Sequence, residues 1–367
     1  CVIIPAYEPG EEFVPYVRDL LERGVTQVLA VDDGSGPDYA CIFAALEAMP
    51  GCTVLRHPAN QGKGAALKTA FGWYLEHPVP DCPGVVTADC DGQHRAEDVL
   101  AVHDALAQGR GGLILGTRTF GADTPKRSLR GNRASAAALS MIYGIKLQDT
   151  QTGLRGIPNA MLPGLCQTAG DRFEFELNML IYARQQCLDF VEVPIHTIYF
   201  DNNRGSHFHT FSDAGRIVLV LLRSILQYAG AAALSVVIDV GMYALLVKAV
   251  LAGLPLSGRL FLSTVLARVV SSVANYACNR TLPYVQNRRV RSTIWKYYLL
   301  WLCQLMTSFA GTWLLTGLLH VDELLGKLLV DIVLALVSYQ VQLRWVFRAD
   351  WGKEDPACPP SSAPMQE

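Results

Sequence analysis

The chain has 367 residues, and its 31 Lys and Arg side chains are balanced by 33 Asp and Glu, which gives a formal net charge of −2 at pH 7. Proteins that bind nucleic acid through bulk charge gather a basic surplus on one face, so this balance argues against that class. Only 17% of the residues are charged, and the mean hydropathy is +0.23. These values exclude a disordered chain and predict that part of the protein lies in lipid.

The 10 cysteines are not arranged as a disulfide scaffold, because none form a C-x-x-C pair and two of them, Cys278 and Cys303, fall within long apolar stretches. We therefore expect reduced thiols in a protein that faces the cytosol. The sequence starts at Cys1, already inside an apolar run. We expect the natural chain to begin earlier, and the presence of a signal peptide is therefore not read from this sequence.

Up to about His209 the chain alternates short apolar runs with amphipathic stretches, which is typical of βα units around a parallel sheet. Strands are expected at Val2 to Pro5, Gln27 to Val31, Thr53 to Arg56, Gly84 to Ala88 and Gly112 to Gly116, and helices at Glu12 to Arg23, Tyr39 to Ala48, Gly64 to Leu75 and Glu97 to Ala107. In an α/β fold of this kind, ligands bind at the carboxyl ends of the strands, where the winding direction switches.

After about Ser212 the sequence contains four apolar segments of membrane-spanning length: Tyr228 to Val250, Leu260 to Leu282, Tyr297 to Leu319 and Leu325 to Val346. The third has no Asp, Glu, Lys, Arg or His, as expected of a helix that crosses a hydrocarbon core of about 30 Å. Residues 212–227 mix Arg216 and Arg223 with aliphatic side chains, which favours a helix at the membrane interface. The alternative is a simple extension of the first span.

Basic residues predict the topology, because Lys and Arg are retained on the cytoplasmic side. One side of the predicted spans carries Arg280, Arg288, Arg289, Arg291, Lys296, Arg344, Arg348 and Lys353, and the other carries Lys248, Arg259 and Lys327. This distribution predicts a multi-pass protein of the cell membrane with the α/β domain and both tails in the cytoplasm.

Two carboxylates, Asp89 and Asp91, follow the apolar strand expected at Gly84 to Ala88, and Gly92 allows the backbone to turn there. Carboxylates two residues apart at a strand end can reach one hard cation. A single D-x-D is a weak signal, but a second acidic turn, Asp32 to Ser35, follows another strand, and Gln93-His94 offers further ligands. Together these residues predict a divalent metal site.

The segment Asn60 to Gly64, NQGKG, precedes a predicted helix but is not a phosphate-binding P-loop. His57 stands five residues before Gly62 where a P-loop has Gly, and Lys63 is followed by Gly64 rather than Ser or Thr. A helix N-terminus with one Lys still suits an anionic ligand. Simple helix capping is an equally good interpretation of this segment.

Six motifs occur in order: the apolar run Val2 to Tyr7, VDDGS at Val31 to Ser35, NQGKG, ADCDGQH at Ala88 to His94, GTR at Gly116 to Arg118 and DTQTGLRG at Asp149 to Gly156. With these motifs the first half resembles family 2 inverting glycosyltransferases, and among them the polyprenol-phosphate sugar transferases related to dolichol-phosphate mannose synthase. The second half resembles GtrA-type four-span domains, on the pattern Arg268, Asn275-Tyr276, Asn279-Arg280, Lys327, Asp331, Ser338-Tyr339 and Arg344 to Phe347.

This resemblance implies a GT-A, Rossmann-like α/β nucleotide-sugar domain followed by an interfacial helix and an all-α transmembrane domain of four helices. We expect the cytosolic domain at 1–211, the interfacial helix at 212–227, the membrane domain at 228–350 and a disordered Pro/Ser-rich tail at 351–367.

The resemblance also implies residue roles. Pro5, Tyr7, Glu8, Asp33, Lys63 and Asp89 would bind the nucleotide-sugar donor, and Asp89, Asp91 and Gln93 would hold Mg²⁺ or Mn²⁺. The residues expected to act in the transfer itself are Asp91, Arg118 and Arg204, the two arginines facing the acceptor phosphate. Asp149 and Glu176 would bind sugar hydroxyls, with structural ion pairing as an equal alternative.

A basic acceptor loop is implied at Lys126 to Ser135, where Arg127, Arg130 and Arg133 compete for one role. Many relatives have Ser-Lys near position 206, whereas this chain has Ser206-His207. If His207 replaces that Lys, acceptor binding becomes sensitive to pH near neutrality.

The expected reaction moves one hexose from GDP-mannose or UDP-glucose to undecaprenyl or dolichyl phosphate. A phosphate monoester has a second pKa of about 6, so its oxygen is already an anion and needs no general base. One in-line displacement would invert the anomeric carbon, while the metal stabilises the nucleoside diphosphate that leaves.

Two other functions remain open. A processive polysaccharide synthase would need Q-x-x-R-W near the site, and the nearest match, Gln340 to Trp345, has one residue too many and ends the last span. A lipid-linked-sugar translocator would use the α/β domain only to bind ligand, although the intact Asp89 and Asp91 argue against an inactive domain. Homo-oligomerisation is left open.

Ionisable side chains within spans are costly and usually face partners or a cavity. We predict that Arg268 pairs with Asp239, Asp331 or both. The pair would act as a structural clamp or line a polar path for a lipid head group.

Overall fold

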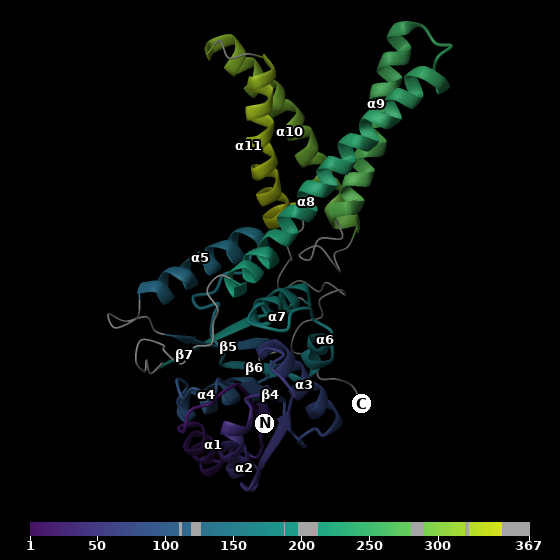
Figure 1. Ribbon diagram of the computed structural model, residues 1–367. Coiled ribbons are helices and arrows are strands. Elements are labelled where there is room, and N and C mark those ends of the chain that lie inside the picture. The colour runs from purple at the N-terminus through teal and green to yellow at the C-terminus, as the bar shows by residue number, and fades with distance from the viewer. Residues whose placement is uncertain are drawn as a thin grey trace. The chain divides into compact units, whose positions relative to one another are not determined.

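The computed structural model describes residues 1–109, 112–118, 126–186, 188–196, 212–279, 290–319 and 323–346 (Figure 1). The described residues divide into two compact units. The first contains Cys1–Ser140 and Ile145–Val220, and the second contains Met141–Gly144 and the helices from Leu221 onward.

The first unit is built on a seven-stranded sheet in the order β3-β2-β1-β4-β6-β5-β7. Its strands are β1 Val2–Ala6, β2 Val28–Asp32, β3 Cys52–Arg56, β4 Gly84–Thr87, β5 Leu113–Arg118, β6 Arg155–Pro158 and β7 Phe190–Ile195. Every neighbouring pair is parallel except those of β6, which runs antiparallel to β4 and β5. The first five strands confirm the prediction from the sequence, and the parallel sheet that we expected contains one reversed strand.

The central strands are buried along their whole length, which explains their continuous apolar sequences. Every residue of β1, β2 and β4 is buried, as in parallel sheets covered on both faces by helices. Alternate residues of β1, such as Ile4, share one core with Phe13 of α1, Phe43 of α2 and Val99 of α4. The helices of this unit are α1 Phe13–Glu22, α2 Ala40–Glu47, α3 Lys63–Glu76, α4 Ala96–Ala107, α5 Lys126–Tyr143, α6 Leu162–Cys166 and α7 Glu174–Gln185.

Helix α5 corrects one expectation. The acceptor loop implied at Lys126 to Ser135 is the first half of a regular helix that continues to Tyr143. Alanines at 134, 136, 137 and 138 and Leu139 are strong helix formers, which explains the difference. Arg130 and Arg133 are exposed on α5, and the side chain of Arg127 lies outside the described residues.

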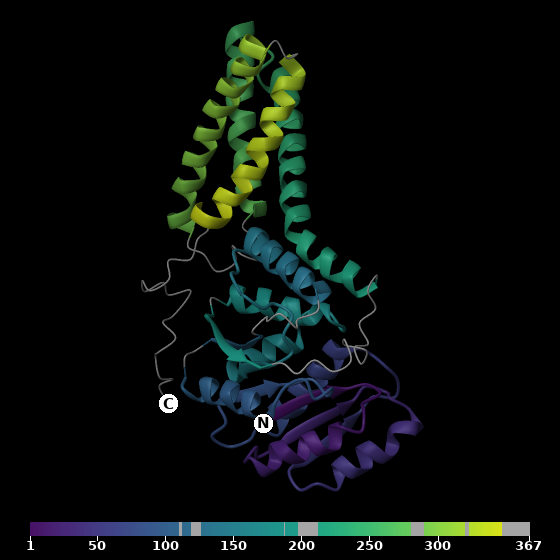
Figure 2. The ribbon, with the colours of Figure 1, turned by 90° about the vertical axis from the view of Figure 1, so that its left-hand side faces the viewer.

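The second unit consists of long helices (Figure 2). They are α8 Ser212–Leu245 with a π turn at Leu246–Val250, α9 Leu256–Asn279, α10 Val290–Leu319, and α11 Glu323–Val341 with a π turn at Gln342–Val346. A helix therefore occupies each predicted span. Because α8 is continuous from Ser212, its backbone matches the alternative of an extended first span.

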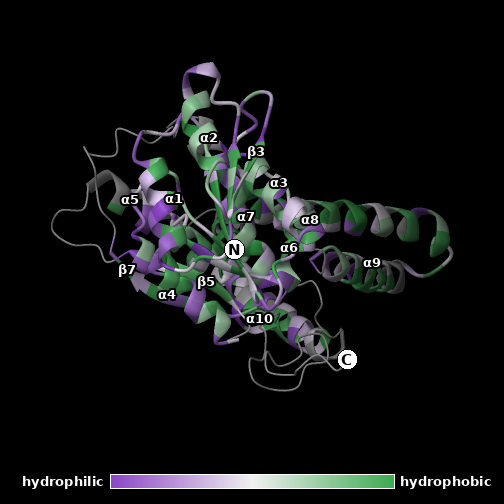
Figure 3. Cartoon of the chain, turned by 90° about the horizontal axis from the view of Figure 1, so that it is seen from below, coloured by the Kyte–Doolittle hydropathy of each residue, from purple (hydrophilic) through white to green (hydrophobic). Residues whose placement is uncertain are grey.

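One described helix segment, Ile225–Val250, is long and apolar enough to cross a membrane, with a mean hydropathy of 2.0, and Ile332–Val346 is a shorter apolar segment. Hydrophobic residues lie all along α8 and α9 (Figure 3). Many are exposed, including Val236 at 62% and Val237 at 68%. A core helix of a soluble protein would bury such side chains, so this surface suits lipid contact.

An ion pair joins α8 and α9 as the sequence predicts. Arg268 Nε lies 3.6 Å from Asp239 Oδ2, and the Ser271 hydroxyl donates to Asp239 Oδ1 at 3.1 Å. The pairing of Arg268 with Asp239 is thus confirmed. The side chain of Asp331 lies outside the described residues.

Buried and half-buried polar side chains connect the helices of this unit at one end. Asn275 Oδ1 accepts from the Tyr297 hydroxyl at 2.7 Å and from Asn279 Nδ2 at 3.0 Å. Asn279 Nδ2 also donates to Gln342 Oε1, and Gln342 Nε2 donates to the Tyr228 hydroxyl, each at 3.3 Å. The network joins α8, α9, α10 and the turn after α11. In an apolar solvent such contacts hold helices in a defined register.

Candidate active site

The site lies at the centre of the sheet, where β1 and β4 are neighbours and the winding switches direction. Tyr7 and Glu8 follow β1, Asp33 follows β2, and Asp89 and Asp91 follow β4. The carboxyl ends of these parallel strands share one edge of the sheet, which is the usual position of ligands in such folds. The sequence-predicted residues therefore converge at one edge.

Asp89 is the centre of a charged cluster. Its Oδ1 lies 2.6 Å from Lys63 Nζ, its Oδ2 lies 3.3 Å from His94 Nε2, and 30% of its side chain is exposed. Burial acts to raise the pKa of Asp89, but the charge of Lys63 and the contact with His94 outweigh it and hold the pKa below its ordinary value. Asp89 is therefore an anion at neutral pH.

Asp91 differs from Asp89 although both belong to the same turn. Its Oδ1 accepts a hydrogen bond from the backbone N–H of Gln93 at 3.1 Å. Burial and the negative charge of Asp89 raise the pKa of Asp91. The chain thus holds two carboxylates close enough to repel each other, an arrangement that an added cation would relieve.

Lys63, the first residue of α3, bridges two acids. Its Nζ contacts Asp89 and lies 2.7 Å from Glu176 Oε1 on α7. Burial alone would lower the pKa of Lys63, but the charges of Asp89 and Glu176 overcome this and raise it. Lys63 is therefore a charged ammonium inside the site at neutral pH.

The segment NQGKG is held in place by Asp33, which is only 3% exposed. Asp33 Oδ2 accepts from the N–H of Gly62 at 2.7 Å, and Oδ1 accepts from the N–H of Gln61 at 2.9 Å and from His57 Nδ1 at 2.7 Å. His57 Nε2 lies 2.9 Å from Thr69 Oγ1 on α3. Asp33 thereby positions the residue before Lys63.

Gly62 has a φ of +104°, and an added Cβ would lie 2.4 Å from the carbonyl oxygen of Asp171. The turn into α3 therefore requires glycine on both conformational and steric grounds.

Two predicted sugar-binding acids are engaged in ion pairs. Asp149 is fully buried and binds the guanidinium of Arg118 with two contacts, from Nε at 2.6 Å and from Nη2 at 2.9 Å. Glu176 is paired with Lys63. The ion-pairing alternative thus describes both acids, and the orientation of Arg118 is set by Asp149.

Sequence reasoning assigned no role to two residues near β6. Arg155 is 1% exposed, donates from Nη1 to the carbonyl of Glu176 at 2.6 Å and from Nε to that of Thr152 at 3.0 Å. An added Cβ at Gly153 would lie 2.4 Å from Asp89 Oδ2. The signal available for Arg155 is a lone charge in the run LRGI, which begins within the motif DTQTGLRG and ends one residue after it. His57 was noted only as a mismatch to the P-loop.

Other predicted residues occupy varied surroundings. Pro5 is buried in β1, whereas Tyr7 and Glu8 are half-buried. Glu8 has a φ of +49°, and its N–H donates to the Ser35 hydroxyl at 2.9 Å. Gln93 is half-buried next to Asp91. Arg204, Ser206 and His207 lie outside the described residues.

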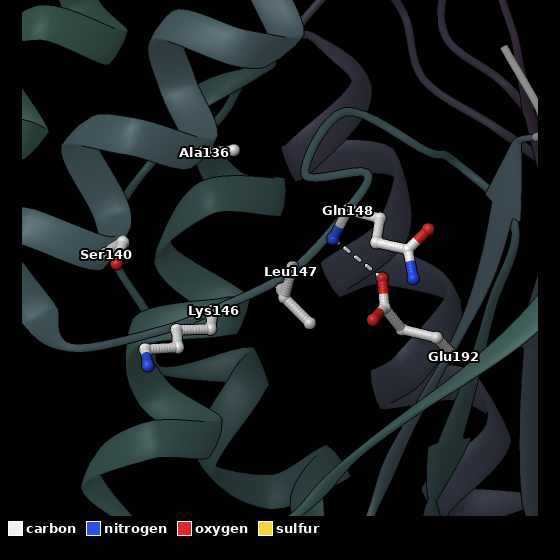
Figure 4. Close-up of a pocket in the computed structure, with 6 residues that line it drawn as sticks. All are labelled: Ala136, Ser140, Lys146, Leu147, Gln148 and Glu192. Carbon is white, nitrogen blue, oxygen red and sulfur yellow. Dashed lines mark hydrogen bonds between the residues drawn. The ribbon is translucent and has the colours of Figure 1, made fainter.

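The structure also contains an open pocket of about 300 Å³, lined by Ala136, Ser140, Lys146, Leu147, Gln148 and Glu192 (Figure 4). The N–H of Gln148 donates to Glu192 Oε1 at 2.8 Å across one side of it. None of the predicted site residues lines this pocket, so it is separate from the acidic cluster.

Comparison with known proteins agrees with this geometry. The family model described as "Glycosyl transferase family 2" matches residues 1–162, and that described as "GtrA/DPMS, transmembrane domain" matches residues 227–347.

Curated relatives match the first half of the chain. A dolichyl-phosphate hexose transferase of Haloferax volcanii is 30% identical over 181 residues, which cover 48% of this chain and 72% of the relative. A UDP-N-acetylglucosamine–dolichyl-phosphate N-acetylglucosaminyltransferase of Methanococcus voltae is 27% identical over 216 residues, covering 54% and 85%. The uncharacterized protein MJ1222 of Methanocaldococcus jannaschii is 30% identical over 214 residues, covering 56% and 85%.

Among solved structures, S. aureus TarS 1–349 in complex with UDP-GlcNAc aligns with a TM-score of 0.39 and 12% identity, over 94% of this chain and 90% of that one. By sequence, the chain belongs to glycosyl transferase family 2 and carries a GtrA/DPMS transmembrane domain. It is a membrane-bound glycosyltransferase with a GT-A-like sheet.

Proposed function

We propose that this enzyme transfers one hexose from a nucleotide sugar to the phosphate of a membrane polyprenol, with inversion at the anomeric carbon and with help from Mg²⁺ or Mn²⁺. The names of two relatives support this, since both act on dolichyl phosphate. The membrane domain supports a lipid acceptor. UDP-glucose and GDP-mannose are the proposed donors, and one relative adds UDP-N-acetylglucosamine as a donor to test.

The observation that carries this proposal is the acidic pair Asp89 and Asp91 at the strand switch, next to Lys63. A nucleotide sugar presents a diphosphate, which a cation held by the two acids and the Lys63 ammonium would bind together. Pro5, Tyr7 and Glu8 after β1 and Asp33 after β2 stand around the same edge, where the nucleoside would lie.

A divalent cation fits the donor atoms present. Among the described residues no group of three or more His, Cys, Asp and Glu is placed to hold a metal. Mg²⁺, however, commonly uses one or two carboxylates and completes its shell with water and substrate phosphates. Asp89 and Asp91 supply the carboxylates. The Tyr16 hydroxyl and His94 Nδ1 are buried without a hydrogen-bond partner among the described residues, and the charges of Asp89 and Asp91 act on Tyr16.

In the proposed reaction the protein orients two anions. When bound, the cation would stabilise negative charge on the departing nucleoside diphosphate. Arg118, fixed by Asp149, and Arg204 would orient the acceptor phosphate behind the anomeric carbon. The exposed Arg130 and Arg133 of α5 would attract the same phosphate. Because that phosphate is already an anion, no side chain needs to remove a proton.

The proposed topology places the glycosyltransferase domain and both ends of the chain in the cytoplasm, with α8 to α11 spanning the cell membrane. The charge asymmetry of the loops supports this orientation. Nucleotide sugars and the acceptor head group would then meet on the same side.

The test incubates membranes that contain the full chain with a labelled nucleotide sugar, polyprenyl phosphate and Mg²⁺ or Mn²⁺, and then separates the extracted lipids. Asp91→Ala should lower lipid labelling at least about 100-fold, since it removes charge stabilisation at the leaving group. Asp104→Ala is the matched control, because Asp104 is an exposed acid of α4 with 74% of its side chain accessible.

Labelling by Asp91→Ala at the parent rate would refute the metal site. A long labelled polymer would instead indicate a polysaccharide synthase. Binding of the sugar lipid with no transfer by the parent chain would indicate a translocator.

A further inference from the structure

Lys63 and the proposed metal require the same atoms. The ammonium lies 2.6 Å from Asp89 Oδ1, whereas His94 Nε2 lies 3.3 Å from the other oxygen. Both oxygens of Asp89 therefore already face a donor from the chain. A divalent cation that binds Asp89 must displace one of these groups or approach a buried positive charge, which is costly in a medium of low dielectric constant.

The competition between Lys63 and the divalent cation concerns Asp89 more than Asp91. Lys63 and His94 contact the two carboxylate oxygens of Asp89 at 2.6 and 3.3 Å, whereas Asp91 Oδ1 accepts the backbone N–H of Gln93. Removal of the ammonium from Asp89 would leave the two acids repelling each other. An incoming cation would compensate for that charge, so release of Lys63 and arrival of the cation are linked.

Lys63 has a second carboxylate partner, which lowers the energetic cost of its release from Asp89. Its Nζ also contacts Glu176 Oε1 at 2.7 Å, and the Glu176 side chain is only 12% exposed. The ammonium can therefore keep one carboxylate partner while it leaves the other. The segment before it is fixed by two backbone hydrogen bonds to Asp33, from Gln61 and Gly62, so the movement is confined to the Lys63 side chain.

We propose that Lys63 is the internal counter-cation of Asp89 and yields that carboxylate to a divalent cation more readily when a nucleoside diphosphate supplies the ammonium with a new anionic partner. This inference rests on the proposed function, because it takes its ligands from that reaction. Lys63 then opposes binding of the metal alone and favours joint binding of the metal and the nucleotide. Metal and nucleotide then bind with positive coupling, each raising the affinity of the other by the same factor.

The test measures Mn²⁺ binding to the purified full chain in detergent, by the electron paramagnetic resonance signal of free Mn²⁺, with and without UDP or GDP. Without nucleotide, Lys63→Met should bind Mn²⁺ about tenfold more tightly than the parent, because a competing charge is gone. In the parent, the matching nucleotide should raise Mn²⁺ affinity by about tenfold, within the usual range of coupling. In Lys63→Met this enhancement should fall below about twofold.

Three variants make the comparison specific. Lys63→Arg keeps the charge and should behave like the parent. Lys63→Gln is a second neutral variant that retains hydrogen bonding, and it should repeat the Met result even if the Met variant folds poorly. Lys68→Met is the matched control, because Lys68 also belongs to α3 and pairs with an acid, Asp171, at 2.6 Å. It should leave Mn²⁺ binding unchanged.

The inference is overturned if the neutral Lys63 variants bind Mn²⁺ no more tightly than the parent. Asp91→Asn separates this failure from failure of the proposed function. If Asp91→Asn weakens Mn²⁺ binding while the Lys63 variants do not alter it, the metal site stands and the counter-cation does not. If Asp91→Asn also binds Mn²⁺ normally, both ideas fail.

Discussion

Asp33 shows how a single side chain can differ from the role that its motif suggests. The resemblance implies that it binds the nucleotide, yet in the structure it accepts three hydrogen bonds from the chain and is 3% exposed. These bonds fix the backbone that carries Lys63. A direct contact with the nucleotide stays a prediction, and any such contact must fit around those donors.

Gly153 gives the most direct prediction for a single residue. An added Cβ would lie 2.4 Å from Asp89 Oδ2, so Gly153→Ala must push the Asp89 carboxylate away from its position. We expect sugar transfer to fall at least about tenfold, as misplacement of a reacting group by about 1 Å can cost more than this. The measurement is kcat/KM for the donor, alongside the unfolding midpoint.

Gly72→Ala is the control for that substitution, since nothing lies within 4 Å of a Cβ added at this position of α3. It should preserve activity and leave stability equal or higher, because alanine favours helix over glycine by about 1 kcal/mol. Full activity of Gly153→Ala would mean that the position of Asp89 is not critical.

At the scale of elements, the turn into α3 depends on His57. The carboxylate of Asp33 can only accept, so His57 Nδ1 carries the proton that it receives. His57 Nε2 contacts Thr69, nearly two turns into α3. The imidazole therefore connects the acidic turn after β2 with the helix that begins at Lys63.

Two substitutions separate the contacts of His57. Asn places an amide N–H near the position of Nδ1 and should keep the bond to Asp33, whereas Gln extends towards Nε2 and should lose it. Loss of a hydrogen bond to a charged group costs about 1.5–3 kcal/mol. We expect His57→Gln to raise the donor KM about tenfold, with the acceptor KM unchanged.

His57→Asn should remain within about threefold of the parent donor KM, if the bond to Asp33 is the important one. Equal losses in the two variants, or a change confined to the acceptor KM, would contradict this role. Because both variants remove the imidazole, a purely structural loss would not distinguish them.

The elements also show what could be predicted from the sequence. The apolar runs of β1, β2 and β4 are visible because those strands are buried at every position. Strand β6 was missed because it has only four residues, one of them charged and another a proline. Arg155 there donates to the carbonyl of Thr152, three residues away, and to that of Glu176, 21 residues away, and no local pattern reveals the second contact.

Among the site residues, the acidic pair and Lys63 converge as expected because all of them follow strands or begin a helix at the same edge. Ion pairing of Asp149 could only be stated as one of two alternatives, without its partner Arg118. Whether Asp149 forms an ion pair or binds a sugar depends on its burial, which the sequence does not reveal at that position. The resemblance implies a loop where the structure has α5, although the residues of this segment favour a helix.

At the scale of the whole molecule, the chain combines a first unit suited to water with a second unit suited to lipid. The first has its own buried core, and in the Methanocaldococcus jannaschii relative the matched region makes up 85% of the protein. The second unit exposes many apolar side chains. We therefore expect residues 1–220 to fold without the membrane helices.

This truncated chain should bind UDP or GDP with Mn²⁺ as the full chain does, because the acidic pair and Lys63 are retained. It should also label a short, water-soluble prenyl phosphate at a similar rate. Labelling of long polyprenyl phosphate in vesicles should fall at least about tenfold, since the enzyme is no longer held where its acceptor is concentrated. The measurement compares initial rates of the two chains on both acceptors.

Equal rates on vesicles would show that the membrane domain does not present the acceptor. Failure on both acceptors by a folded chain of 1–220 would show that the helices complete the active site.

The partial exposure of Asp89 has a practical consequence for inhibitor design. A compound directed at Asp33 would have to compete with an imidazole and two backbone amides, and it would gain little binding energy from that exchange. Asp89 keeps 30% of its side chain accessible. A cationic drug fragment of the size of an ammonium group could displace Lys63 there, since Lys63 keeps Glu176 as a partner, and lock the enzyme against its own metal.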